Sequence, residues 1–281
     1  MSKKARSALS LNFLSIAAIL ATAPLAATSP ANASAFSFTQ VDAPNATLTR
    51  ALGINDAGQI VGDFRNSTGT HGFLDTGGSV TQLDVPGATA TTANRINDAA
   101  QIVGVFTNST GTHGFLDTGG SFTQLDVPGA TSTQARGIND AGQIVGVFTN
   151  STGTHGFLDT GGSFTPLDVS GTSFTTAFGI NDAGQIVGFF TNSTGSHAFL
   201  DTSGSFTQLD VPGATVGDAT LGTGGTAAAG INDAGQIAGL FFNSTGEHGF
   251  LATPVPEPAT LILLSIGLTL TGLAMMRRRA T

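Results

Sequence analysis

The chain has 281 residues, enough for one large domain or two smaller ones, and it contains 39 Gly but no Cys, Trp or Tyr. Between residues 36 and 253, four arginines stand against sixteen aspartates and one glutamate, a net charge of −13. A segment this acidic does not bind nucleic acid through its phosphates, which requires clustered Lys and Arg. The lack of Cys excludes a disulfide framework, a thiolate metal site and a Cys nucleophile.

Residues 1–35 have the three parts of a secretory signal peptide. Three cations lie within the first six residues, an apolar run follows from residue 9 to about 27, and Ala33 and Ala35 fit the small-x-small rule for cleavage. We therefore predict an N-terminal signal helix that signal peptidase removes after Ala35. The alternative is an uncleaved anchor, which we favour less because Pro24 interrupts the apolar run.

The middle of the chain repeats one unit five times. Each copy carries an Ile-Asn-Asp triplet, an Asn-Ser-Thr-Gly motif and one His, and successive copies lie 42, 42, 42 and 51 residues apart. The asparagines of the triplet are Asn55, Asn97, Asn139, Asn181 and Asn232. The fifth copy has nine extra residues within 216–225. A period near 42 is typical of repeat architectures.

One unit, residues 131–172, contains four short apolar runs rich in Ile, Val, Phe and Thr. Turn sequences with Asn or Asp early and Gly late separate these runs, which predicts tight hairpins. Three hairpins and four strands make an antiparallel meander of the size of a propeller blade. A stacked β-solenoid is the alternative.

The two ends of the repeat region favour a closed propeller. The last unit lacks a fourth strand, and residues 36–42 copy that strand, as comparison with residues 121–126 shows. A closed ring can use this offset, because the N-terminal strand then covers two exposed edges. We predict an all-β fold over residues 36–253: a five-bladed β-propeller of four-stranded antiparallel blades, in which residues 36–42 pair with the strand around residues 248–252.

Residues 254–281 form a second targeting segment. Its parts are, in order, Pro256, Glu257 and Pro258, an apolar stretch over 259–276, and Arg277, Arg278 and Arg279. Eighteen residues at a rise of 1.5 Å span about 27 Å, enough for a transmembrane helix. The three arginines favour a cytoplasmic C-terminus. An ordinary single-span anchor is the alternative.

This arrangement resembles the PEP-CTERM sorting signal of Gram-negative bacteria. The resemblance implies recognition by a membrane-embedded exosortase, removal of the helix, and release to the cell surface or the extracellular matrix. The repeats also resemble extracellular HAF repeats, through the Gly-Ile-Asn-Asp-Ala-Gly-Gln-Ile-Val-Gly core at residues 137–146 and the His-Ala-Phe form at residues 197–199. That resemblance implies an extracellular location and no defined biochemistry.

The repeated polar residues have structural explanations beside functional ones. The histidines are His71, His113, His155, His197 and His248. Imidazole is a common metal ligand, but one His per blade predicts hydrogen bonding at a strand start and no metal site. The aspartates predict turn capping, and Ca²⁺ remains an alternative on the acidic charge alone. The Asn-Ser-Thr motifs predict hairpin loops, although they are formal glycosylation acceptors. We therefore expect no cofactor.

Catalysis requires a constellation that is not repeated, and few residues qualify. The non-repeated polar residues are Arg50, Asp63, Arg65, Arg95, Arg136, Asp218 and Glu247. Five-bladed propellers host hydrolases that use carboxylates, so a polysaccharide-acting hydrolase is one hypothesis. We favour the other, a non-catalytic surface or extracellular-matrix protein whose propeller face binds a polymer or partner, such as an exopolysaccharide or a surface protein.

Overall fold

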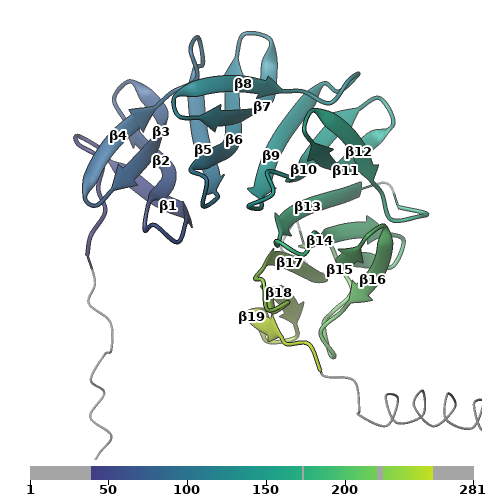
Figure 1. Ribbon diagram of the computed structural model, residues 1–281. Helices are drawn as coiled ribbons and strands as arrows, with labels where there is room; N and C mark the ends of the chain where they lie inside the picture. The colour runs from purple at the N-terminus through teal and green to yellow at the C-terminus, as the bar shows by residue number, and fades with distance from the viewer. Residues whose placement is uncertain (1–38, 173, 220–223, 256–281) are drawn as a thin grey trace, which may run out of the picture. The chain divides into compact units, whose positions relative to one another are not determined.

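A computed structural model of the chain describes residues 39–172, 174–219 and 224–255, and this part is all-β, with nineteen strands and no α-helix (Figure 1). By their internal contacts, the described residues from Val41 onward belong to one unit. The predicted signal segment 1–35 and the predicted helix 259–276 lie outside the described residues.

Each of the five sequence repeats forms an antiparallel meander, and we call these meanders units one to five. Units one to four have four strands each and unit five has three. The strands are β1 (Leu48–Ile54), β2 (Ile60–Asn66), β3 (Gly69–Thr76) and β4 (Ser79–Leu83); β5 (Ala90–Ile96), β6 (Gln101–Asn108), β7 (Gly111–Thr118) and β8 (Ser121–Leu125); β9 (Ser132–Ile138), β10 (Ile144–Asn150), β11 (Gly153–Thr160) and β12 (Ser163–Leu167); β13 (Phe174–Ile180), β14 (Gln185–Asn192), β15 (Gly195–Thr202) and β16 (Ser205–Leu209); β17 (Thr226–Ile231), β18 (Ile237–Asn243) and β19 (Gly246–Ala252).

The predicted hairpin turns are confirmed. In unit three Thr160 pairs with Ser163, which leaves a two-residue turn of Gly161 and Gly162. Their φ angles are 61° and 88°. Two successive residues with positive φ match the right-handed twist of the flanking strands, and glycine adopts that conformation without strain.

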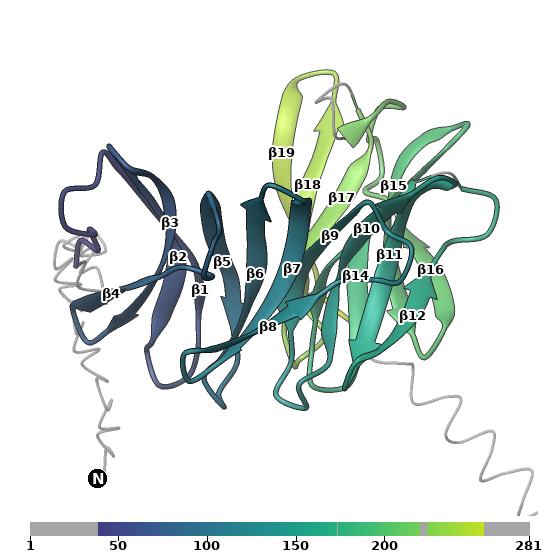
Figure 2. The ribbon, with the colours of Figure 1, turned by 90° about the horizontal axis from the view of Figure 1, so that it is seen from above.

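The units are propeller-like in how they touch. Units one to four are joined by single parallel residue pairs, such as Thr70 with Ala90, and unit five forms a separate sheet, so no continuous parallel ladder of the solenoid kind joins the described units. Side chains pack across the junction instead: Val61 of unit one lies in a cluster with Ala93, Ile102 and Phe115 of unit two. The same packing recurs at the next two junctions, and Figure 2 shows the units following one another in chain order. Each unit therefore stabilises its neighbour by burying apolar surface.

The predicted closure of the propeller is not found, because the sheet is not closed. Among the described residues β19 pairs with β18 alone, and residues 39–42 of the predicted closing strand are not in a strand. Val41 and Ala43 pack instead against Phe64 and Phe73 of unit one. The neighbouring segment forms the same turn as residues 85–88, with the Ala46 N–H donating to the Ala43 carbonyl at 3.2 Å. Apolar contacts with unit one thus hold the segment next to the predicted strand.

Ala100 occupies a turn position at which the other four units have glycine. It has a φ of 57°, and the glycine at this position in unit three, Gly142, has a φ of 75°. A Cβ in the left-handed region costs about 1 kcal/mol. We expect Ala100→Gly to raise the free energy of unfolding by about 1 kcal/mol, measured by urea denaturation.

The reverse change supplies the control. At Gly142 the nearest atom to an added Cβ is Gln101 Oε1 at 3.5 Å, so Gly142→Ala adds backbone strain without a clash. It should destabilise the chain by about the same 1 kcal/mol. A neutral Ala100→Gly would contradict the assignment of backbone strain to this turn.

Candidate functional site

The first strands of the five units end in Ile-Asn-Asp triplets that line one polar pocket. The pocket has a volume of about 340 Å³ and is bordered by residues 54–56, 96–98, 138–140, 180–182 and 231–233. We call it the Asn-Asp pocket. Sequence reasoning treated these triplets as turn residues and missed that they meet, although their constant spacing was a signal that they occupy equivalent places.

The asparagines of the triplets tie each unit to the next. Asn55 Nδ2 donates to the Asn97 carbonyl at 3.1 Å and to Gln59 Oε1 at 2.9 Å, while its Oδ1 accepts the Gln59 N–H at 2.9 Å. The bond between units recurs from Asn97 to Asn139, from Asn139 to Asn181 and from Asn181 to Asn232. In these four asparagines the side-chain nitrogen donates and the side-chain oxygen accepts hydrogen bonds within the protein, so their role is structural. They are Asn55, Asn97, Asn139 and Asn181.

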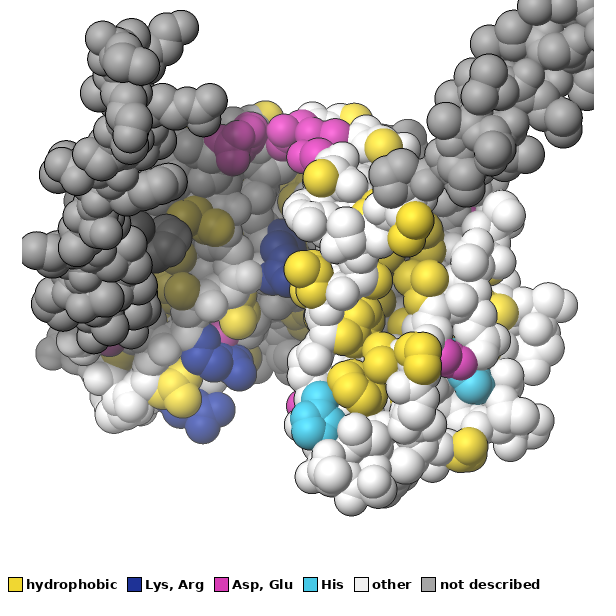
Figure 3. Space-filling model, turned by 90° about the horizontal axis from the view of Figure 1, so that it is seen from below, with side chains coloured by type: hydrophobic (Ala, Val, Ile, Leu, Met, Phe, Trp, Pro, Cys, Tyr) yellow, Lys and Arg dark blue, Asp and Glu magenta, His cyan; other side chains and the backbone are white. Residues whose placement is uncertain are grey.

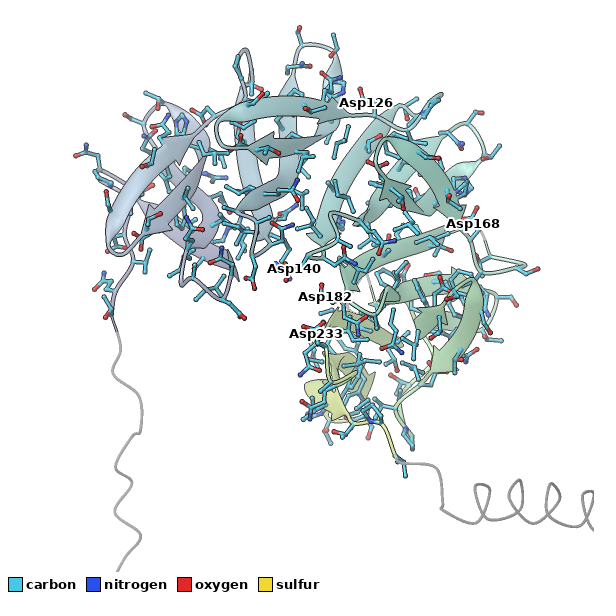
Figure 4. All side chains as sticks on the ribbon, viewed as in Figure 1. Asp126, Asp140, Asp168, Asp182 and Asp233 are labelled. Carbon is cyan, nitrogen blue, oxygen red and sulfur yellow. The ribbon has the colours of Figure 1, made fainter. Side chains whose placement is uncertain are left out.

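The aspartates of the triplets form a second series of bonds and carry the charge of the pocket. The Asp98 N–H donates to Asp140 Oδ1 at 2.9 Å, and the Asp140 N–H donates to Asp182 Oδ1 at 2.9 Å. Asp140, Asp182 and Asp233 lie toward the middle of the molecule, whereas Asp126 and Asp168 lie at its outer side (Figure 4). The Asn-Asp pocket therefore gathers carboxylates that attract cations and accept hydrogen bonds from hydroxyl groups.

The structure gives each repeated His its own local partners. His71 Nδ1 lies 2.8 Å from Asp84 Oδ2, and its Nε2 lies 2.8 Å from Thr68 Oγ1. The same contacts recur at His113, His155 and His197, and His248 contacts Thr245 and Asn243. In the described ranges no group of three or more His, Cys, Asp or Glu lies close enough to hold a metal ion. The hydrogen-bonding role predicted for the histidines matches these contacts.

The Thr68, His71 and Asp84 arrangement has the connectivity of a catalytic triad but not its chemistry. Asn66 Oδ1 accepts the Thr68 N–H at 2.8 Å and the Thr68 hydroxyl at 2.6 Å. The Thr68 hydroxyl therefore donates to Asn66 Oδ1, so its proton is not directed at His71 Nε2. Four copies of this arrangement fasten a hairpin loop to the outer strand.

The residues of the hydrolase hypothesis do not converge. Arg50 and Asp63 form an ion pair at 2.9 Å, in which the carboxylate accepts bonds from two guanidinium nitrogens. Arg95 donates to backbone carbonyls of Leu52 and Asn94. Glu247 is exposed on β19. Within residues 39–172, 174–219 and 224–255, the structure therefore pairs Arg50 with Asp63, and Glu247 lies apart on β19.

Aspartates at other hairpins cap turns, as predicted. The carboxylate of Asp159 accepts the Gly162 N–H at 2.7 Å, and that of Asp117 accepts the Gly120 N–H at 2.8 Å. Burial raises the pKa of both aspartates, and the bond from the glycine N–H acts in the opposite direction. Their role is to hold the turn between the third and fourth strands.

Comparison with solved structures finds similar propeller-like folds. A streptogramin B lyase structure is 16% identical over 75% of this chain and 71% of that chain, with a TM-score of 0.46. A structure of YCF48 from Cyanidioschyzon merolae is 13% identical over 66% of this chain and 61% of that chain, with a TM-score of 0.37. At these values nothing about activity is carried over. Comparison with curated proteins finds no match.

The C-terminus gives the most specific match. Residues 254–279 match the PEP-CTERM protein-sorting motif, which confirms the interpretation of the Pro-Glu-Pro triplet, apolar stretch and arginines. In the described part of the chain no helix is long and apolar enough to cross a membrane, and the predicted helix 259–276 lies outside that part. The motif marks this chain as an exported, transiently membrane-anchored protein that an exosortase processes.

Proposed function

We propose that the chain is a non-catalytic surface or extracellular-matrix protein that binds a polymer through the face carrying the Asn-Asp pocket. The observation that carries this proposal is the fivefold recurrence of the Ile-Asn-Asp triplet around one pocket. A polymer repeats its own chemistry along its length, so equivalent groups at equivalent positions suit it. The hydrolase hypothesis finds less support, because the non-repeated carboxylates do not converge.

In this proposal the five units are the blades of a propeller, with the pocket at the end where the first strands finish. The support is that the asparagine bond between units has the same donor, acceptor and length, 3.0–3.1 Å, at all four junctions. Signal peptidase removes residues 1–35 during export, and the exosortase then releases the chain to the cell surface or the matrix.

The chemistry of the pocket points to a neutral, hydroxyl-rich polymer such as an exopolysaccharide. Carboxylates accept hydrogen bonds from hydroxyl groups and do not donate any when ionised. An acidic polymer is disfavoured by the net charge of −13 between residues 36 and 253. The proposed ligand is therefore a sugar polymer whose hydroxyl groups donate hydrogen bonds to the aspartates of the pocket.

The test is binding of the full chain to exopolysaccharide isolated from the matrix of its own host. A triple variant with Asp98, Asp140 and Asp182 changed to Asn keeps an oxygen acceptor at each position and removes three charges. We expect it to bind at least about tenfold more weakly, because bonds to charged acceptors are stronger than bonds to neutral ones.

The matched control changes Asp126, Asp168 and Asp210 to Asn, an equal loss of charge at aspartates that contact the histidines. This variant should bind like the unaltered chain. Equal weakening in both variants would contradict a role for the pocket, as would no binding by the unaltered chain. Release of reducing ends from the polymer would support the hydrolase instead.

A further inference from the structure

The five units differ most on one face of their first strands. Counted back from the Ile of the triplet, the second residue before it is Leu52, Asn94, Arg136, Phe178 or Ala229, whereas the fifth before it is Thr and the third before it is Ala in every unit. Alternate residues of a strand share a face, so this variation lies on one side. In the second strands, the position three residues before the Asn of the Asn-Ser-Thr-Gly motif varies in the same way. Its residues are Asp63, Val105, Val147, Phe189 and Leu240.

These variable positions meet in a pocket between units three, four and five. It has a volume of about 380 Å³ and includes Arg136 of β9, Phe178 of β13, Phe189 of β14 and Leu240 of β18. Ala219, from the nine-residue insertion of unit five, also borders it. We call it the Arg136 pocket. Several departures from the repeat in units three to five thus gather at one place, as a specific binding site requires.

The wall of this pocket is aromatic. Phe178 and Phe189 stack with ring centroids 5.9 Å apart and planes 17° apart, and Phe174 lies 5.4 Å from Phe189. Figure 3 shows a face of the molecule on which hydrophobic side chains gather beside a hollow that holds arginine side chains. Phenylalanine side chains supply apolar contact area and favour flat apolar partners.

Arg136 supplies the one charge that lines the pocket. Its guanidinium carbon lies 4.8 Å from the ring centroid of Phe178, and Nη2 donates to Gln134 Oε1 at 2.9 Å. Its Nε is buried without a hydrogen-bond partner, and no ion pair joins Arg136 to a carboxylate of the described residues. Burial lowers the pKa of Arg136 below its usual value. Because Arg136 lines the pocket and pairs with no carboxylate of the described residues, an anionic group in the pocket would have the guanidinium as its partner.

We propose that the Arg136 pocket binds a small organic acid, with its carboxylate on the guanidinium and its apolar body against Phe174, Phe178 and Phe189. A volume of about 380 Å³ is within the range of ordinary small-molecule sites. A guanidinium matches the planar geometry of a carboxylate. The negative charge elsewhere in the chain is screened beyond about 8 Å at physiological ionic strength. This site is separate from the Asn-Asp pocket and does not depend on polymer binding.

The test is calorimetric titration of the full chain in lipid nanodiscs with 3-phenylpropionate, with empty nanodiscs as the blank. 3-Phenylpropionamide keeps the apolar body and lacks the charge, so it should bind at least about tenfold more weakly. Arg136→Asn introduces the residue that unit two carries at this position. It should weaken binding of the acid about tenfold or more and leave binding of the amide unchanged.

Two further variants keep the proposal falsifiable. Phe178→Ala introduces the residue of unit five and should weaken binding of both probes. Arg65→Thr introduces the residue of unit two at an exposed position outside the pocket and should change neither. The proposal is overturned if the acid does not bind, if acid and amide bind equally, or if Arg136→Asn and Arg65→Thr behave alike.

Discussion

Replacing Glu257 by Ala, or Arg277, Arg278 and Arg279 by Ser, should leave nearly all of the chain unprocessed in the membrane of a host that has an exosortase. Glu257 lies in the Pro-Glu-Pro part of the matched motif, and the arginines form or adjoin its end. Without recognition the apolar stretch over residues 259–276 is not removed, and eighteen uncharged residues are enough to hold the chain in a bilayer. Fractionation followed by immunoblotting measures the membrane-bound and released forms.

Glu247→Ala is the matched control for this experiment. Glu247 is the one other glutamate of the chain, is exposed on β19 and lies outside the matched residues 254–279. The variant removes the same charge and should be processed and released like the unaltered chain. Equal release of the Glu257, triple-Arg and Glu247 variants would show that the motif does not direct sorting in this chain.

Gly146→Ala should destabilise the chain by about 3 kcal/mol or more. An added Cβ at Gly146 would overlap the carbonyl oxygen of Gln134 and lie 2.8 Å from the Phe157 ring. The register of β9 and β10 shifts between Val145 and Gly146, and this irregularity brings the two backbones close. The atom in the way belongs to the backbone, so β9 must move away from β10. Urea denaturation measures the loss.

Gly230→Ala is the control for this steric argument. Gly230 lies at the same kind of register shift, in the first strand of unit five, but an added Cβ there has no atom within 4 Å. The free energy of unfolding should change by no more than about 0.5 kcal/mol. Similar losses at Gly146 and Gly230 would mean that strand propensity, and not the close backbone approach, limits stability.

The strands and turns could be predicted from the sequence because their determinants are local. Asn and Asp cap turns and Gly accepts positive φ, so the substitution at Ala100 could be recognised as a strained copy of the same turn. The closure could not be predicted in this way. The similarity of residues 36–42 to a fourth strand identifies the kind of strand but not its partner, which depends on contacts such as those of Ala43 with Phe64 and Phe73.

The Arg136 pocket shows a different limit of sequence reasoning. Arg136 could be selected because it is charged and not repeated, but Phe178 and Phe189 are two of 20 phenylalanines. Which of these rings face a common space depends on strand register and on the packing of units three to five. Aligning the five copies residue by residue would have marked the same positions, because their variation departs from a nearly constant background.

The asparagine bonds between units have a consequence for how such a chain changes in evolution. The bond from Asn181 to Asn232 spans 51 residues and that from Asn139 to Asn181 spans 42, yet both are 3.1 Å long. Because every unit offers its neighbour the same donor and acceptor, deleting or duplicating one whole unit creates no new kind of junction. The copy number can therefore change in whole units, and the nine extra residues within 216–225 alter unit five while the asparagine bond at its junction is kept.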